Sequence, residues 1–220
     1  MKNLFRLSQG LISFVQVVRD PLRLDEVINI VSKLRDPVIY REVIEDFQGS
    51  AHGREALLRK TRLRAVDLQQ LKILPAGTLG RVFADHLDAN NLDPKDLPSL
   101  PAKDDFDYVE AHVYETHDIW HVLTGFDTDV PGELGLQAFS LAHFRTRVPL
   151  VLLAAGLLNT LFYRYDERHF RMDAIIAGWE KGKEARSLLG VPWDLYWNKP
   201  LAEVRREFNI QPYGPRSSSS

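Results

Sequence analysis

The chain of 220 residues contains no cysteine. This absence excludes disulfide bonds, thiolate nucleophiles, iron–sulfur clusters and zinc sites with sulfur ligands. Any metal ion must therefore be held by imidazole nitrogen and carboxylate oxygen. With 45% hydrophobic and 26% charged residues, the chain is otherwise typical of a soluble globular protein that is long enough to bury a core.

An excess of positive charge is also missing, since 28 Lys and Arg stand against 30 Asp and Glu. Binding to a phosphate backbone requires a basic surface, so we expect no nucleic-acid partner. The charge is uneven: residues 85–133 hold thirteen acids and two lysines, a local −11, which leaves +9 for the rest of the net −2. The acidic segment suits either a cation site or solvated helix faces.

Long hydrophobic runs and strand patterns are scarce. The longest uncharged apolar stretch, residues 148–163, is shorter than the ~20 residues of a spanning helix, and we interpret it as a buried helix. No sustained alternation of β-branched residues occurs, so the sequence predicts an all-α fold. The expected helices cover residues 4–18, 21–34, 37–47, 51–60, 67–73, 78–89, 105–124, 131–144, 149–165, 170–189 and 200–208.

Two Asp-Pro pairs, Asp20-Pro21 and Asp36-Pro37, resemble helix starts. Residues 4–18 favour a mature amphipathic helix over a cleaved presequence. We expect one compact helical domain over residues 1–216, with a possible division near 90–103, where three prolines interrupt the helices. The serine tail 217–220 is expected to be disordered.

The most informative pattern is His117-Asp118-Ile119-Trp120-His121, followed by Glu133. On a helix, His117 and His121 lie one turn apart on one face, so both imidazoles can bind one ion. Asp118 stands beside that face as a third ligand or as a carboxylate acting on metal-bound water. A turn near Gly125 would bring Glu133, in the first turn of the next helix, back to the histidines.

Such a ligand set suits a divalent metal, with zinc first and magnesium or manganese as alternatives. The site is expected to lie between two consecutive helices and to keep an open coordination position. A buried, hydrogen-bonded polar cluster is the alternative interpretation. A zincin protease is disfavoured because Asp118 replaces the glutamate of HExxH and is one methylene shorter. An HD-type phosphohydrolase is disfavoured because its further ligands are not identified in the sequence.

The pattern HDxxH-x11-E resembles the signature of the fourth protein of coenzyme Q (ubiquinone) biosynthesis, and the spacing matches without gaps. Residues 115–129 and 132–139 are similar to the central block of that family. Similarity extends to residues 74–80 and 193–210, so it covers roughly residues 70–210.

The resemblance implies an all-helical protein that binds a metal through His117, Asp118, His121 and Glu133. It implies binding of polyprenyl lipids, peripheral membrane association, dimerisation and assembly with other quinone-biosynthesis proteins. For activity, it implies metal-dependent oxidative decarboxylation at ring carbon 1 of a polyprenylated hydroxybenzoate precursor. An alternative is a non-catalytic scaffold that binds polyprenyl lipid and organises these enzymes at the membrane.

We expect an enzyme, and the resemblance implies an oxidative decarboxylase of the lyase class. Asp118 and Glu133 are the expected catalytic residues. No dinucleotide-binding fingerprint is visible, so the oxidant would be dioxygen or a partner enzyme. The absence of an obvious long presequence suggests a bacterial member, cytoplasmic and peripheral on the inner face of the membrane. A eukaryotic member would occupy the matrix face of the mitochondrial inner membrane.

A polyprenyl tail needs an apolar groove between helices. The apolar stretch 148–163 supplies candidate walls for such a groove, and Gly156 would let a chain approach closely. The predicted lipid-binding residues are Val151, Leu152, Leu157, Leu158, Leu161 and Phe162.

Overall fold

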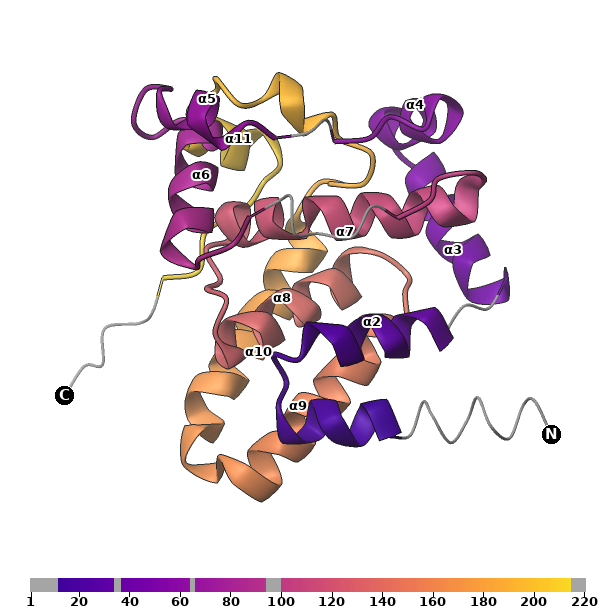
Figure 1. Ribbon diagram of the computed structural model, residues 1–220, viewed down its shortest axis with the longest axis vertical. Helices are drawn as coiled ribbons and strands as arrows, with labels where there is room; N and C mark the ends of the chain where they lie inside the picture. The colour runs from indigo at the N-terminus through magenta and orange to yellow at the C-terminus, as the bar shows by residue number, and fades with distance from the viewer. Residues whose placement is uncertain (1–11, 34–36, 64–65, 94–99, 215–220) are drawn as a thin grey trace. The chain divides into compact units, whose positions relative to one another are not determined.

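A computed structural model describes residues 12–33, 37–63, 66–93 and 100–214, and every regular element in these ranges is helical (Figure 1). The all-α prediction is confirmed. After a first helical segment at residues 12–19, the α-helices are α2 (Leu24–Lys33), α3 (Pro37–Gln48), α4 (Ala51–Arg59), α5 (Leu68–Lys72), α6 (Leu79–Ala89), α7 (Asp105–Thr124), α8 (Val130–His143), α9 (Val148–Tyr163), α10 (Arg168–Glu184) and α11 (Leu201–Glu207). Two short 3-10 helices are η2 (Tyr165–Glu167) and η3 (Trp193–Leu195).

Local capping residues mark the start of five helices. The side chains of Ser50, Asp67, Thr78, Asp104 and Asp129 each accept a hydrogen bond from a backbone N–H in the first turn of the helix that follows. These bonds satisfy donors that a helix start leaves without intrahelical partners. Most predicted helices are therefore found within two residues of their predicted ends.

Two predicted boundaries are wrong. Helix α2 begins at Leu24 rather than residue 21, because Asp20 Oδ1 accepts the Leu22 N–H in a turn and starts no helix there. Helix α10 spans 168–184 rather than 170–189. Beyond it, the Arg186 N–H donates to Phe208 O at 2.8 Å, and Leu188 is fully buried. Residues 4–11 of the first predicted helix, Asp36 and the tail 217–220 lie outside the described residues.

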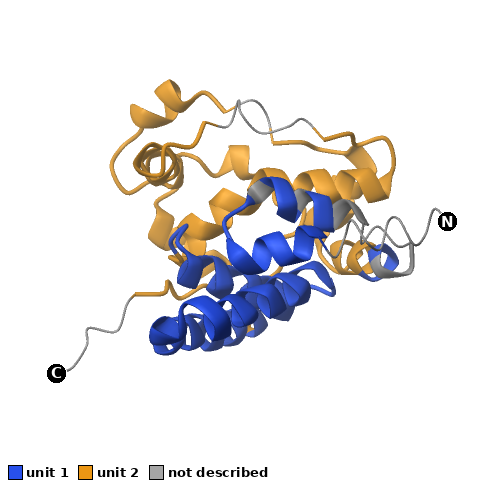
Figure 2. Ribbon diagram, turned by 60° about the horizontal axis from the view of Figure 1, so that its bottom comes forward, with its two compact units in different colours: residues 1–42, 127–183 blue, residues 43–126, 184–220 orange. Residues whose placement is uncertain are grey.

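The chain divides into two compact units, coloured separately in Figure 2: unit 1 comprises residues 1–42 and 127–183, and unit 2 comprises residues 43–126 and 184–220. The first cut falls inside α3. The described part of residues 90–103, where a division was expected, lies within unit 2. The expectation of a single domain stays a prediction.

Unit 1 is built on the close approach of α8, α9 and α10. A Cβ atom on Gly178 would lie 2.0 Å from the Gly135 carbonyl oxygen, so α10 contacts the backbone of α8 directly. Gly156 of α9 faces Leu134 of α8, whose side chain occupies the space that we expected a lipid chain to approach. The first helical segment joins this core through Val17, which packs with Ile30 and Ala155.

Unit 2 is organised around α7, against which α4, α6 and α11 all pack. Tyr108, Ile119, Trp120 and Leu123 of α7 are almost completely buried. Among the described residues, no single helix is long and apolar enough to cross a membrane; α9 and the segment 165–184 pass that test only together, and they are bent by 118°.

Candidate metal centre

Helix α7 carries the predicted metal motif and has defined caps at both ends. Asp104 Oδ1 accepts the Asp107 N–H at 2.8 Å. Two acidic residues in the first turn stabilise the helix further, because they interact with the positive end of the helix dipole. The helix ends at Gly125, whose φ of +75° suits a residue without a side chain. The two histidines are thereby held in a continuous helix at the predicted spacing.

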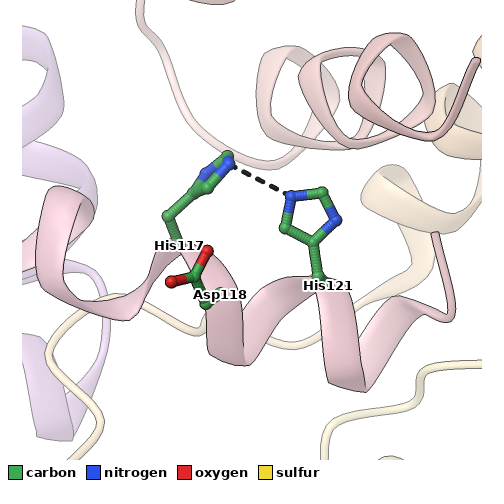
Figure 3. A group of neighbouring side chains, drawn as sticks. All are labelled: His117, Asp118 and His121. Atoms are coloured by element: carbon green, nitrogen blue, oxygen red, sulfur yellow. Dashed lines mark hydrogen bonds between the residues drawn. The ribbon is translucent and has the colours of Figure 1, made fainter. Parts of the chain in front are cut away.

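His117 and His121 project from one face of α7 toward each other (Figure 3). Their Nε2 atoms are 3.2 Å apart, and one ligand atom from each of His117, Asp118 and His121 lies within 4.8 Å of the others. His117 and Asp118 are half-buried, whereas His121 is only 1% exposed. The structure therefore gathers three of the four predicted ligands at one point.

The ring orientation of His121 is set by the turn that follows the helix. Its Nδ1 lies 2.9 Å from the Phe126 carbonyl oxygen, and because a carbonyl only accepts, Nδ1 must carry the proton. In the neutral ring, Nε2 then presents its lone pair toward His117. Metal-binding histidines commonly have this arrangement, with the outer N–H donated to a backbone carbonyl.

The spacing of the imidazole nitrogens fits a common ion. Two nitrogens bound to one zinc at about 2.0–2.1 Å in tetrahedral geometry are about 3.3 Å apart, close to the observed 3.2 Å. Two imidazoles and a carboxylate are a ligand set that zinc accepts, and magnesium or manganese would use more oxygen ligands. For His117 to bind through Nε2, that atom must give up its proton.

Two residues that the sequence analysis left out also lie at this face. Tyr114 precedes His117 by three positions, and its buried hydroxyl has no hydrogen-bond partner among the described residues. Burial raises the pKa of this hydroxyl, and the charge of Asp118 raises it further. His86 of α6 stacks on His121 with ring centroids 5.9 Å apart.

Only one of these two contacts had a signal in the sequence. His86 is 31 residues upstream of His117, so helical spacing cannot connect the two. Tyr114 does have the right spacing, since residues three and four apart share a face, and that signal would have found it.

Glu133, the fourth predicted ligand, lies in the first turn of α8 in unit 1 and is half-buried. Helix α8 starts as expected, with Asp129 as the N-cap and Pro131 in the first turn. The three ligands on α7 belong to unit 2. The inclusion of Glu133 in the metal site stays a prediction.

The predicted lipid-binding residues of α9 fall into two groups. Val151 and Leu152 are half-buried and pack against the cluster of Val17, Ile30 and Ala155. Leu157, Leu161 and Phe162 are exposed, and Leu158 is half-buried. Tyr163 at the end of α9 is also exposed. The exposed apolar side chains continue into η2 and α10, with Tyr165, Phe170, Met172, Ile176 and Trp179. Lipid binding by these residues stays a prediction.

Comparison with known proteins places these features in context. A sequence model of the family described as coenzyme Q (ubiquinone) biosynthesis protein Coq4 matches residues 1–214. A mitochondrial ubiquinone biosynthesis protein COQ4 homolog from Xenopus tropicalis is 27% identical over 212 residues, covering 94% of this chain and 73% of that protein. The corresponding mitochondrial protein of Caenorhabditis elegans is 26% identical, covering 95% of this chain and 91% of that protein.

The fold is also similar to a solved structure. The crystal structure of a protein from Nostoc punctiforme, described as a ubiquinone biosynthesis protein, superposes with a TM-score of 0.79. It is 27% identical and covers 91% of this chain and 96% of its own. Sequence and fold therefore agree on the same family.

Proposed function

Since the chain belongs to the coenzyme Q (ubiquinone) biosynthesis protein Coq4 family, we propose that it is a metal-dependent enzyme that oxidatively decarboxylates ring carbon 1 of a polyprenylated hydroxybenzoate precursor. The bond from ring carbon 1 to the carboxyl carbon breaks and carbon dioxide leaves. Ring carbon 1 gains a hydroxyl oxygen from water. The ring gives up two electrons to dioxygen, which is reduced to hydrogen peroxide.

The observation that supports this proposal is the pair of imidazole nitrogens 3.2 Å apart beside a carboxylate on α7. In this proposal, His117, Asp118, His121 and Glu133 hold a divalent metal, with zinc preferred. When bound, such an ion supplies a Lewis acid for the ring hydroxyl and carboxylate of the substrate. Membership of the family supports the choice of a quinone precursor as substrate.

The chain's own residues have distinct roles in this proposal. His121 is held in one tautomer by the Phe126 carbonyl and orients the site. Asp118 is half-buried and, when ionised, accepts the proton of the substrate ring hydroxyl. Tyr114, whose buried hydroxyl has no hydrogen-bond partner among the described residues, donates a hydrogen bond to the substrate. Glu133 completes the site as a further carboxylate.

Elemental analysis of the purified protein tests the metal site. We expect about one equivalent of metal in the unaltered chain and its loss in His117→Gln. His169→Gln is the matched control, because His169 is an exposed histidine outside the motif. Metal content that is equal in all three proteins would contradict the proposed ligand set.

The second candidate function is a non-catalytic scaffold that binds polyprenyl lipid and organises quinone-biosynthesis enzymes at a membrane. The exposed apolar side chains of α9 and α10 favour it, since Phe162 is 66% and Phe170 70% exposed. Exposed apolar groups of this size are typical of lipid or protein contacts. In this second function the metal is structural.

Vesicle flotation with phosphatidylcholine and phosphatidylglycerol tests the lipid contact. We expect the double variant Phe162→Ser, Phe170→Ser to lose most of its binding to the vesicles. Leu58→Ser is the control, since Leu58 is an exposed apolar residue of α4 in unit 2. Equal binding of both variants would count against a membrane contact at α9 and α10.

The two functions also differ in what Glu133→Ala does. For the enzyme, this variant loses carbon dioxide release but keeps its fold and lipid binding. For the scaffold, it loses stability or association with partner proteins.

We further propose peripheral association with the inner face of a bacterial membrane, or the matrix face of the mitochondrial inner membrane. We also propose that the protein forms a homodimer that assembles with other quinone-biosynthesis proteins.

A further inference from the structure

The end of α7 is held by the C-terminal segment, residues 201–213, which follows the metal motif by about eighty residues. Arg205 of α11 donates from Nε to the Leu123 carbonyl oxygen at 2.9 Å and from Nη2 to the Val122 carbonyl oxygen at 2.8 Å. These carbonyls belong to the last turn of the helix, which lacks intrahelical donors and carries partial negative charge. Arg205 is half-buried, and this burial lowers the pKa of its guanidinium.

A second contact holds the turn that follows. The Tyr213 N–H donates to the Thr124 carbonyl oxygen at 2.6 Å, and the Tyr213 ring stacks on Phe126 with centroids 4.8 Å apart. The approach is tight at Gly125, where an added Cβ would lie 2.8 Å from the Tyr213 carbonyl oxygen. Phe126 is 1% exposed, so the turn has little room to shift.

This turn carries the carbonyl that orients the metal-binding histidine. Phe126 O accepts the Nδ1–H of His121 at 2.9 Å, and the Gly125 N–H donates to His121 O at 2.8 Å. If Phe126 moves, the Nδ1–H loses its acceptor and the proton can transfer to Nε2. The Nε2 lone pair would then no longer be available to a metal ion.

From these contacts we propose that Arg205 and Tyr213 are positioning residues for the metal centre, which hold the Phe126 carbonyl and so fix the tautomer of His121. Their hydrogen bonds described above go to the backbone carbonyls of Val122, Leu123 and Thr124. The inference rests on the proposed metal function for its effect on affinity, but its effect on the His121 tautomer does not require a metal. The two claims can therefore fail separately.

The test compares Arg205→Met and Tyr213→Ser with Arg206→Met, an exposed arginine on the same helix. Nitrogen chemical shifts of the His121 ring in the metal-free protein report the tautomer. Chelator competition with Zn²⁺ reports the affinity. In Arg205→Met and Tyr213→Ser we expect a mixture of His121 tautomers and a loss of Zn²⁺ affinity of about tenfold or more, as is typical when outer contacts of a metal ligand are lost. In Arg206→Met the affinity should change by less than about twofold.

Tyr213→Phe keeps the ring stack and the backbone N–H, so this variant should have the same His121 tautomer and Zn²⁺ affinity as the unaltered protein. If Arg205→Met does not fold, Tyr213→Ser and Tyr213→Phe still decide the question. An unchanged His121 tautomer in a folded Tyr213→Ser protein would overturn the inference. If the unaltered protein binds no Zn²⁺, the proposed metal function fails, and the tautomer comparison alone decides on the positioning role.

Discussion

His112 Nε2 accepts a hydrogen bond of 3.0 Å from the Gly190 backbone N–H, which ties the middle of α7 to the loop before η3. His112 is 3% exposed. An acceptor nitrogen in a buried ring requires the neutral imidazole. Five residues before the metal motif, the same helix thus uses a histidine to hold a loop, whereas His117 and His121 face each other at 3.2 Å.

The buried His112 makes the free energy of unfolding depend on pH. Burial, with the nearby charge of Arg62, lowers its pKa to about 4, from 6.5 in the unfolded chain. The unfolded state therefore binds more protons between pH 4 and 6.5, so the contribution of His112 to stability is complete above pH 6.5 and is lost as the pH falls toward 4.

That loss amounts to about 3 kcal/mol by the usual conversion of pKa differences to free energy. Urea denaturation between pH 4 and 7 measures it. The increase in the free energy of unfolding between pH 4 and 7 should become smaller in His112→Gln and should persist in the exposed-site control His169→Gln. An unaltered slope in a folded His112→Gln protein would show that another group is responsible.

The ion pair between Arg62 and Glu115 joins the segment after α4 to α7. Arg62 contacts both carboxylate oxygens of Glu115 and donates from Nη1 to the Leu100 carbonyl oxygen. Both side chains are mostly buried, so removing one partner leaves a charge with poor solvation. We expect Glu115→Ala to lower the free energy of unfolding by about 1–3 kcal/mol.

Asp85→Ala provides the comparison, because the pair of Arg81 and Asp85 lies on the surface of α6. Surface pairs four residues apart on a helix contribute about 0.3–0.5 kcal/mol. Chemical denaturation of both variants measures the difference. Equal losses would mean that burial of the Arg62 pair adds nothing.

Arg171 links three parts of unit 1 and is 2% exposed. Its guanidinium donates to Asn159 Oδ1 at 2.7 Å, to Thr160 Oγ1 at 3.0 Å and to Glu167 Oε2 at 2.8 Å. Asn159 in turn donates to the Val18 carbonyl oxygen at 2.9 Å. Arg171→Met should cost about 3–5 kcal/mol, since it leaves several buried polar groups without partners.

Arg164→Met is the matched variant, because Arg164 pairs with the same Glu167 but is largely exposed. We expect a loss of about 1 kcal/mol or less. Thermal unfolding of both proteins distinguishes them. A similar shift in melting temperature for the two variants would contradict the buried network.

The sequence allowed the fold to be predicted where local residues set the structure. Both ends of α7 were predicted because Asp104 and Gly125 are local cap signals. The end of α10 was not, since it depends on the Arg186 N–H reaching Phe208 O, a contact 22 residues away that no local pattern encodes.

The same division applies to the candidate site. The spacing of His117 and His121 predicts their shared face, and the structure shows it. The stacking of His86 on His121 and the hold of Arg205 on α7 depend on how α6 and α11 pack against α7. Such tertiary contacts leave no periodic signal in the sequence.

Decarboxylation is measured by the release of labelled carbon dioxide from a polyprenylated hydroxybenzoate that carries ¹³C in its carboxyl group. We expect release by the metal-loaded protein in the presence of dioxygen, with one hydroxylated ring formed for each carbon dioxide. Release should fall by about 10²-fold or more in Asp118→Asn, the scale of a lost general acid–base group, while His169→Gln keeps the activity of the unaltered chain. Absence of labelled carbon dioxide from a folded, metal-loaded protein would contradict the enzymatic account and favour the lipid-binding scaffold.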